Sequence, residues 1–214
     1  MPATVRYDEQ YCPIARALDV LGDRWTLLIL RELVIGEQRF TDLRAHLPGI
    51  APTMLTQRLR TLRDQGLITV KDLPPPAARS VYSATERGRT VVPVLRALTR
   101  WGMPLLKEPD DDVIVRPWTA ANAAVGAFFD EQAAGDTDER YLLVIDGEEF
   151  RLSSVVGGGD ARDTFDLTLV STARVWIDIR QGRTTLCNAI KSGRIERVGS
   201  SDALANFARV FQLD

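Results

Sequence analysis

One predicted helix surface has side chains suited to hydrogen bonding rather than to simple solvation. In the stretch GIAPTMLTQRLRTLRDQGLI (residues 49–68), Leu55, Leu59 and Leu62 recur at helical spacing and predict one buried stripe. The opposite side is polar, and its only acid is Asp64, near the end of the stretch. Its forward positions are Thr53, Thr56, Gln57 and Arg60. Thr and Gln can hydrogen-bond base edges and Arg can reach guanine or phosphate, so this surface predicts contact with a polyanion.

Other kinds of chemistry have little support. The single histidine, His46, argues against histidine-based metal clusters and a histidine-dependent hydrolase. Cys12 and Cys187 lie far apart and form no metal-binding or redox pair motif. No phosphate loop or nucleophile elbow is present. The sequence therefore predicts a protein that is not an enzyme and has no metal or cofactor.

Charge divides the 214 residues into two halves. Residues 1–106 hold 15 Lys and Arg against 10 Asp and Glu, a net +5, whereas residues 107–214 hold 12 against 19, a net −7. The basic half is the candidate for binding a polyanion, although chance variation of the surface is an alternative. The sequence has no apolar run long enough to span a membrane and no secretory signal, so we expect no membrane partner. The two separated cysteines fit the reducing cytoplasm.

The elements expected around the polar helix follow the order of a winged helix-turn-helix. Helices are predicted over 12–21 and 22–35, then a short helix with Thr41 as N-cap and Phe40 packed before it. After the turn at Pro48 and Gly49, the polar helix begins at Pro52 and stops at Gly66. A hairpin over 67–85 and a helix over 86–106 complete the half. In this arrangement the polar helix enters the major groove.

Specific residues follow from this placement. Thr53, Thr56, Gln57 and Arg60 are the predicted base-reading residues. Arg58 and Arg63 flank them and are predicted to contact phosphate, with simple solvation of the helix as the alternative. Arg79 lies at the hairpin tip, within reach of the minor groove or backbone. The predicted DNA-binding set is Pro52, Thr53, Thr56, Gln57, Arg58, Arg60, Arg39 and Arg79. The last helix carries more apolar surface than a small domain would bury, which predicts a dimer interface with Val91, Leu95, Leu98 and Trp101.

Residues 10–106 resemble the HxlR family of bacterial transcription regulators. The marks are an ordered set: Cys-Pro at 12–13, Arg24-Trp25, Arg39-Phe40, Gly49-Ile50, Leu55-Thr56, Arg58-Leu59, Gly66-Leu67-Ile68, and Tyr82 with Thr85 and Gly88. The resemblance implies a homodimer on a pseudo-palindromic operator, with the first and last helices forming the interface. It also implies that Cys12 can act as a redox sensor. The alternative, which we favour, is that Cys12 is a small apolar residue of the dimer interface. The chain departs from the family pattern at Ala51, where a small polar N-cap is usual.

The acidic half alternates helix and strand signals. A helix is expected over 119–133, a hairpin around Asp146-Gly147, and a strand in TFDLTLVS (164–171). TARVWIDIRQG (172–182) fits either a strand or a helix capped by Ser171. A short helix over 184–193, a strand over 194–199 and a closing helix over 201–214 follow.

This second pattern resembles the sterol-carrier-protein fold, on Gly182, Ala189, Gly193, Ile195 and Gly199. The resemblance resolves residues 172–182 as a helix and implies a hydrophobic ligand such as a fatty acid. The pocket candidates are Phe128, Phe129, Trp176, Leu186, Ile190, Phe207 and Phe211. The alternative is that these side chains fill an ordinary core.

These inferences combine into one overall prediction. The fold class is α+β, with a DNA-binding and dimerisation domain at 1–106, a linker at 107–118 and a sterol-carrier-like domain at 119–214. The predicted function is a homodimeric transcription regulator of double-stranded DNA, controlled by an apolar ligand. The alternative is a lipid carrier whose winged domain mediates protein contacts.

Overall fold

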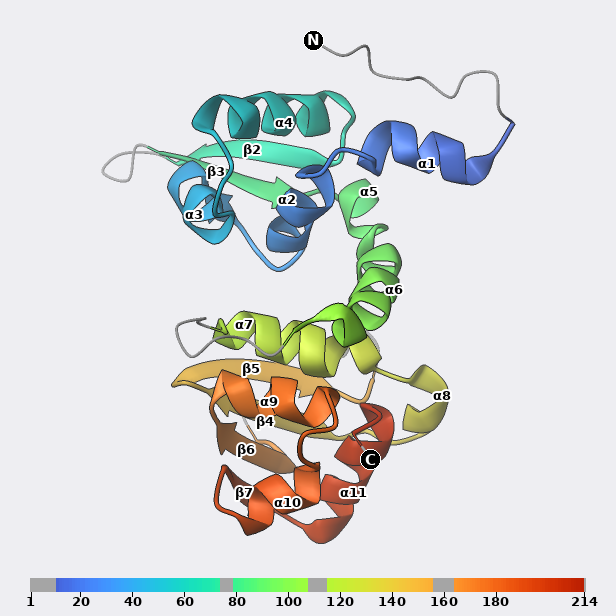
Figure 1. The fold of residues 1–214 in the computed structure, drawn as a ribbon, viewed down its shortest axis with the longest axis vertical. Helices are drawn as coiled ribbons and strands as arrows, with labels where there is room; N and C mark the ends of the chain where they lie inside the picture. Colours follow the sequence, from blue (N-terminus) through green and yellow to red (C-terminus); the bar gives the residue numbers. More distant parts are fainter. Residues whose placement is uncertain (1–10, 74–78, 108–114, 156–163, 214) are drawn as a thin grey trace. The chain divides into compact units, whose positions relative to one another are not determined.

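The computed structural model describes residues 11–73, 79–107, 115–155 and 164–213 (Figure 1). The chain divides into two compact units, residues 1–95 and 96–214. The division lies within a helix, before the predicted linker at 107–118, and most of that linker lies outside the described residues. The exact domain bounds therefore stay a prediction.

The first unit contains a helix-turn-helix and a small antiparallel sheet in the order β1-β3-β2. Its elements are α1 (Pro13–Leu21), α2 (Thr26–Leu33), β1 (Gln38–Arg39), α3 (Phe40–His46), α4 (Pro52–Asp64), β2 (Ile68–Leu73), β3 (Arg79–Ala84), α5 (Glu86–Arg89) and the start of α6 (Val92–Gly102). The predicted hairpin is confirmed: β2 and β3 pair from Ile68 with Ala84 to Leu73 with Arg79. This hairpin is the wing.

Leucine and isoleucine side chains of α2, α3 and α4 form the core of the first unit. Ile29, Leu33, Leu43 and Leu55 have no exposed surface. Trp25 and Leu28 are only partly buried, and they pack against the edge of this core. Fully burying a leucine contributes about 1.5–3 kcal/mol, so the three helices are held mainly by this cluster.

Two predicted helix boundaries are wrong. Thr41 is not the N-cap of α3: the helix begins at Phe40, and Asp42 Oδ2 accepts a hydrogen bond from the backbone of Arg39 (3.3 Å). The helix expected over 86–106 is interrupted. α5 ends at Arg89, α6 starts at Val92, and a 3-10 turn, η1 (Met103–Leu105), follows.

A close approach holds α5 against the wing. Thr85 caps α5 by accepting from the backbone N of Gly88 (3.0 Å), and its hydroxyl donates to the carbonyl of Gly66 (2.8 Å). A Cβ at Gly88 would lie 2.0 Å from the carbonyl oxygen of Leu67. This short helix is therefore held against the wing, and the chain turns at Thr90 before α6 begins.

The second unit is a four-stranded sheet in the order β5-β4-β6-β7, in which β4 and β6 are parallel and the other pairs antiparallel. Its elements after η1 are α7 (Pro117–Thr119), η2 (Ala120–Val125), η3 (Gly126–Phe128), α8 (Glu131–Ala134), β4 (Arg140–Ile145), β5 (Glu148–Ser153), β6 (Leu167–Ser171), α9 (Ala173–Arg180), α10 (Leu186–Lys191), β7 (Ile195–Gly199) and α11 (Ser201–Val210). The helix predicted over 119–133 is confirmed in part. Residues 117–128 are helical throughout, as α7, the π-helix η2 and the 3-10 helix η3, but the chain breaks at Phe129 and Asp130, and Asp130 caps the separate helix α8.

The ambiguous segment 172–182 is a helix, α9. Its side chains from Val175 to Ile179 are all buried, so their alternating apolar pattern carries no information about a strand. The predicted cap is wrong, because Thr172 is the N-cap and Ser171 ends β6. The Ser171 hydroxyl instead accepts a hydrogen bond from Trp176 Nε1 (2.8 Å).

Candidate nucleic-acid interface

The exposed face of α4 is built by the leucine stripe on its other side. Leu55, Leu59 and Leu62 are at most 3% exposed. The helix starts at Pro52, because a proline in the first turn loses no helical hydrogen bond. After the helix ends, the chain turns away at Gly66, whose φ of +70° favours glycine. Burying this stripe fixes the helix about its own axis, which turns the opposite face to solvent.

All four predicted base-reading residues lie on this exposed face, which we call the recognition face: Thr53, Thr56, Gln57 and Arg60. The Thr56 hydroxyl donates to the carbonyl of Pro52 (2.9 Å), which leaves its oxygen lone pairs available as acceptors. Arg60 makes no hydrogen bond or ion pair with any described residue, so its guanidinium is available to a ligand. Pro52 is exposed at the start of the same face.

Arg58 does not belong to the recognition face. Its Nη2 lies 2.6 Å from Asp23 Oδ2, and both side chains are about a quarter exposed, at 25% and 26%. Asp23 also accepts from the backbone N of Trp25 (2.9 Å) at the start of α2. The guanidinium thus joins α4 to α2 through a partly buried ion pair, and its predicted phosphate contact stays a prediction.

A second polar surface lies between the start of α3 and the wing. Arg39 and Val81 pair across β1 and β3, and a groove of about 410 Å³ is lined here by Arg39, Phe40, Thr41, Ser80 and Tyr82. The Arg39 side chain is 46% exposed and lies 4.0 Å from Asp42 Oδ2. Ser80 and Tyr82 lie on β3, and the sequence analysis did not place them in a site. Their position beside Arg39 depends on the pairing of β3 with β1, and a strand of two residues leaves no periodic signal in the sequence.

Arg79 is paired with Leu73 at the outermost described position of the wing. Its side chain lies outside what the structure describes, so its contact with DNA stays a prediction.

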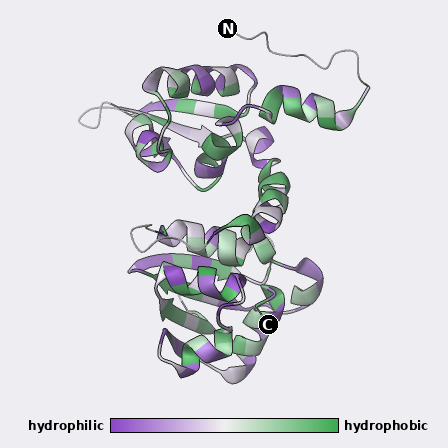
Figure 2. Ribbon diagram, viewed as in Figure 1, coloured by the Kyte–Doolittle hydropathy of each residue, from purple (hydrophilic) through white to green (hydrophobic). Residues whose placement is uncertain are grey.

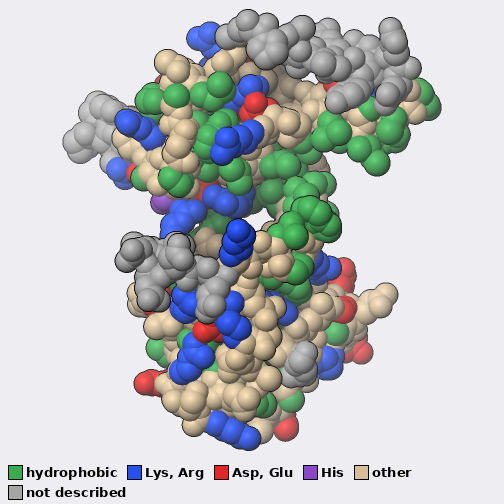
Figure 3. All heavy atoms as spheres, in the orientation of Figure 1, with side chains coloured by type: hydrophobic (Ala, Val, Ile, Leu, Met, Phe, Trp, Pro, Cys, Tyr) green, Lys and Arg blue, Asp and Glu red, His purple; other side chains and the backbone are tan. Residues whose placement is uncertain are grey.

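Apolar side chains are exposed on α1 and α6, where Figure 2 shows hydrophobic residues and Figure 3 shows hydrophobic side chains gathered. On α1, Ile14 is 71% exposed. On α6, Leu98 is 44% and Trp101 is 71% exposed. Leu95 is half-buried against the first core. Val91 was predicted in the dimer interface, but it is 6% exposed and belongs to that core, so it offers little surface to a partner.

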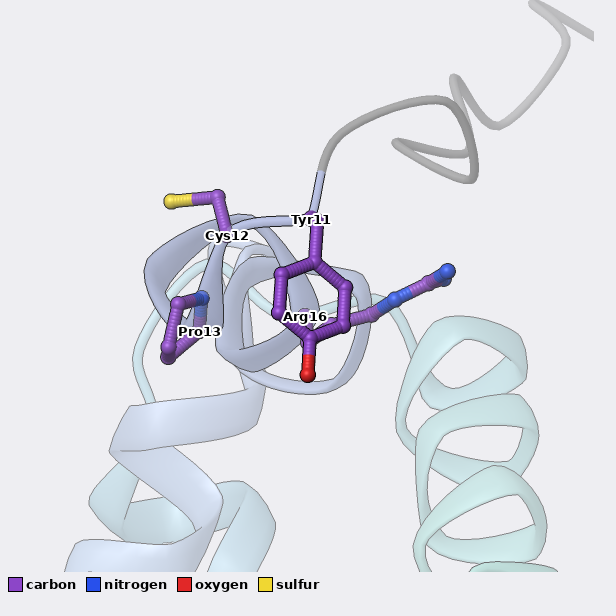
Figure 4. A pocket seen from close by; sticks show the side chains of 4 residues that line it. All are labelled: Tyr11, Cys12, Pro13 and Arg16. Atoms are coloured by element: carbon purple, nitrogen blue, oxygen red, sulfur yellow. The ribbon is translucent and has the colours of Figure 1, made fainter.

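Cys12 stands just before α1 at the edge of a pocket of about 320 Å³, with Tyr11, Pro13 and Arg16 (Figure 4). The side chain of Cys12 is half-buried. Figure 4 shows its sulfur pointing away from the Arg16 guanidinium, which instead lies 3.3 Å from Asp19 Oδ2. The Arg16 guanidinium therefore does not lie against the thiol of Cys12.

Most of the predicted ligand-pocket residues fill the core of the second unit. Trp176, Phe207 and Phe211 are at most 2% exposed, and their rings contact one another with centroids 4.9–6.2 Å apart. Leu186 is buried and Ile190 packs against the same core. Phe129 also packs on it, whereas Phe128 lines an open groove on a different side of this unit.

Comparison with known proteins identifies the first unit. The model of the HxlR-like helix-turn-helix family matches residues 20–110. A helix-turn-helix transcriptional regulator of Methanothermobacter thermautotrophicus is 38% identical over 95 residues, which are 44% of this chain and 72% of the relative. The chain belongs to the HxlR-like helix-turn-helix family. It is accordingly a helix-turn-helix transcriptional regulator of the HxlR type.

Other transcriptional regulators are similar to the same part of the chain. Regulator sll1512 of Synechocystis is 40% identical over 97 residues, covering 45% of this chain and 72% of the relative. YvaP of Bacillus subtilis is 33% identical over 93 residues, covering 43% and 86%. A solved structure of a MarR-family regulator from Porphyromonas gingivalis W83 is 32% identical, with a TM-score of 0.43, and covers 45% of this chain and 95% of that one.

Metal-binding and membrane-spanning features are absent from the described residues. No group of three or more His, Cys, Asp or Glu side chains in these segments is arranged to hold a metal ion. Among the same residues, no helix is long and apolar enough to cross a bilayer.

Proposed function

We propose that this HxlR-like regulator binds double-stranded DNA by inserting α4 into the major groove. The observation that carries the proposal is the recognition face, where Thr53, Thr56, Gln57 and Arg60 are exposed and Arg60 is unpaired among the described residues. Thr and Gln suit base edges and Arg suits guanine or phosphate. Arg39, Pro52 and Arg79 would flank this face as backbone contacts.

The protein acts as a homodimer on a pseudo-palindromic operator in this proposal. The support comes from two sets of exposed apolar side chains, Ile14 on α1 in the first unit, and Leu98 and Trp101 on α6 in the second, whose contact with water is unfavourable. Cys12 lies at the start of α1. In the proposed dimer it is either an apolar residue covered by the partner or a thiol that an oxidant can reach. A two-fold dimer would set two recognition helices about 34 Å apart, one turn of DNA.

The second unit serves in this proposal as a ligand-responsive domain of sterol-carrier type. Its mixed sheet, with a parallel β4-β6 pair flanked by antiparallel edges, is compatible with that fold. Binding of an apolar ligand would shift the population of dimers toward one spacing of the recognition helices.

The experiment that tests DNA binding is selection of duplexes from a random pool by the full chain, followed by fluorescence anisotropy on the selected site. Arg60→Ala should weaken binding to the selected site by about 1–3 kcal/mol and should lower the salt dependence. The matched control is Lys191→Ala, which removes an exposed positive charge from α10 in the other unit. Equal affinities for the wild type and Arg60→Ala would remove Arg60 from the interface. No salt-sensitive binding at all would refute the proposal and favour the lipid-carrier alternative.

A further inference from the structure

A groove of about 460 Å³ in the second unit combines positive charge with apolar walls. Its lining comes from the end of α6, from η1 and the residue after it, from η3, and from the end of α9 with the loop that follows. We call it the arginine groove. Its residues are Arg100, Met103, Pro104, Leu106, Phe128, Arg180, Gln181 and Arg183. The volume is in the range of small-molecule sites, about 300–1,000 Å³.

Two of its arginines have no carboxylate within ion-pair distance among the described residues. Arg100 donates from Nε to the carbonyl of Ala127 (2.7 Å) and from Nη2 to the carbonyl of Phe129 (3.2 Å). Arg180 donates to the carbonyls of Ala124, Phe211 and Gln212. These carbonyls hold both guanidiniums in place, but they pair neither positive charge with a negative one.

The positive charges of Arg100 and Arg180 also repel each other. Loss of water through burial, with the positive charge of Arg100 nearby, lowers the pKa of Arg180 from its ordinary 12.5 to about 10. Because this pKa is still well above neutral pH, Arg180 stays protonated, and the folded protein keeps two positive charges close together. An anion bound beside them would relieve this repulsion.

Arg183 adds a third positive charge to the groove, and part of its guanidinium is hydrogen-bonded to Asp178. Its Nε and Nη2 both donate to Asp178 Oδ1, at 2.9 and 2.7 Å, and its Nη1 makes no hydrogen bond to the described residues. Asp178 cannot neutralise it fully, because the same carboxylate also accepts from Arg174 (3.2 Å) and Arg194 (2.5 Å).

The rest of the groove is apolar. The guanidinium carbon of Arg180 lies 3.8 Å from the centroid of the Phe128 ring, and that of Arg100 lies 5.7 Å from it. Met103 is buried at one wall, whereas Leu106 is 52% exposed at the rim. Gln181 Nε2 donates to the carbonyl of Leu106 (3.0 Å), but its buried Oε1 has no hydrogen-bond partner in the described structure. The groove thus combines apolar walls with excess positive charge.

We propose that the arginine groove binds a small carboxylic acid with an apolar tail. The carboxylate would lie against Arg100 and Arg183, and the tail would lie along Phe128, Met103 and Leu106. This inference rests on the proposed function and gives its ligand control a site and a chemical class. It differs from the pocket expected among Trp176 and Phe207, which the core fills.

Calorimetric titration of the full chain with octanoate at neutral pH tests the site. Octanoate should bind and octanamide, its uncharged analogue, should bind at least about tenfold more weakly, because only the acid meets the unpaired charges. Inorganic phosphate, which has charge but no tail, should also bind more weakly. Comparable binding of octanoate and octanamide, tighter binding of phosphate, or no heat with octanoate would each overturn the proposal.

Leu106→Asp places a carboxylate at the rim and should reduce octanoate affinity about tenfold through repulsion at a few ångströms. The matched control is Leu105→Asp, the same change at the preceding residue, which is 63% exposed and does not line the groove. Both variants should keep the wild-type melting temperature, since neither side chain is buried. Equal octanoate affinity in the two variants would overturn the assignment of the site. Because no DNA is present, failure of this titration leaves the role of α4 in DNA binding untouched, and loss of DNA binding leaves the titration unchanged.

Discussion

The ion pair between Arg58 and Asp23 leads to a prediction that separates stability from DNA binding. Arg58 is on the recognition helix, yet its Nη2 is 2.6 Å from Asp23 Oδ2 at the start of α2. If this contact is structural, Arg58→Ala should destabilise the first unit and leave DNA affinity unchanged. Arg60→Ala, two positions along the same helix, should do the reverse.

The expected magnitude follows from the burial of the pair. Fully exposed ion pairs contribute about 0–1 kcal/mol, whereas hydrogen bonds to charged groups contribute about 1.5–3 kcal/mol. The two side chains are 25% and 26% exposed, so we expect a coupling energy of about 1–2 kcal/mol. In a domain of about 100 residues each kcal/mol shifts the melting temperature by roughly 4–8 °C.

A double-mutant cycle measures this coupling directly. Urea unfolding of the wild type, Arg58→Ala, Asp23→Ala and the double variant gives the free energy of unfolding of each. The cycle cancels the loss of the hydrogen bond that Asp23 accepts from Trp25 N, since both Asp23 variants lack it. A coupling energy below about 0.3 kcal/mol together with a loss of DNA affinity in Arg58→Ala would refute our assignment and return Arg58 to the recognition face.

Two further predictions concern the dimer and the second unit. Trp101→Asp puts a charge on the exposed apolar surface of α6, where Trp101 is 71% exposed, and should convert the dimer to a monomer by light scattering; a dimer that persists would exclude this surface from the interface. Burial raises the pKa of Asp178, but hydrogen bonds from three arginines outweigh it and hold that pKa below its ordinary 3.8. Asp178 therefore contributes stability above about pH 4, the unfolded value, and loses it as the pH falls through the lower folded pKa. The difference in unfolding free energy between the wild type and Asp178→Asn should be largest at neutral pH and narrow in acid, and a difference independent of pH would contradict this.

Periodicity explains which parts of the first unit the sequence predicts well. The leucine stripe of α4 repeats at helical spacing over about two turns, so both the helix and its exposed face follow from the order of the amino acids alone. The packing of α5 against the wing does not, since it depends on the approach of Gly88 to Leu67, which lie in different elements. The break between α5 and α6 does have a sequence signal, because Pro93, in the first turn of α6, has no N–H to donate to the carbonyl of Arg89. The partner of Arg58 was equally hidden, because Asp23 is distant in the sequence and spacing within α4 holds no information about it.

The second unit shows the limit of residue type as evidence for a ligand pocket. Aromatic side chains such as Trp176 and Phe207 suit a pocket and a core equally well, and here they contact one another with no exposed surface. The arginine groove was not predicted, because its charged residues come from α6 and from the end of α9. Only the folded chain brings Arg100 and Arg180 to one place.

The same physical criterion distinguishes binding residues from structural ones in both units. An arginine that has a carboxylate within hydrogen-bond distance spends its charge inside the protein, as Arg58 does with Asp23. Arg60 on the recognition face and Arg100 in the groove have no such carboxylate among the described residues. Arg183 shares the carboxylate of Asp178 with two other arginines, so we expect these three to keep positive charge for a ligand. Sequence position alone treats all four alike. On this criterion we expect α4 to bind the polyanion and the second unit to bind the small acid, and each activity should be lost in variants that leave the other in place.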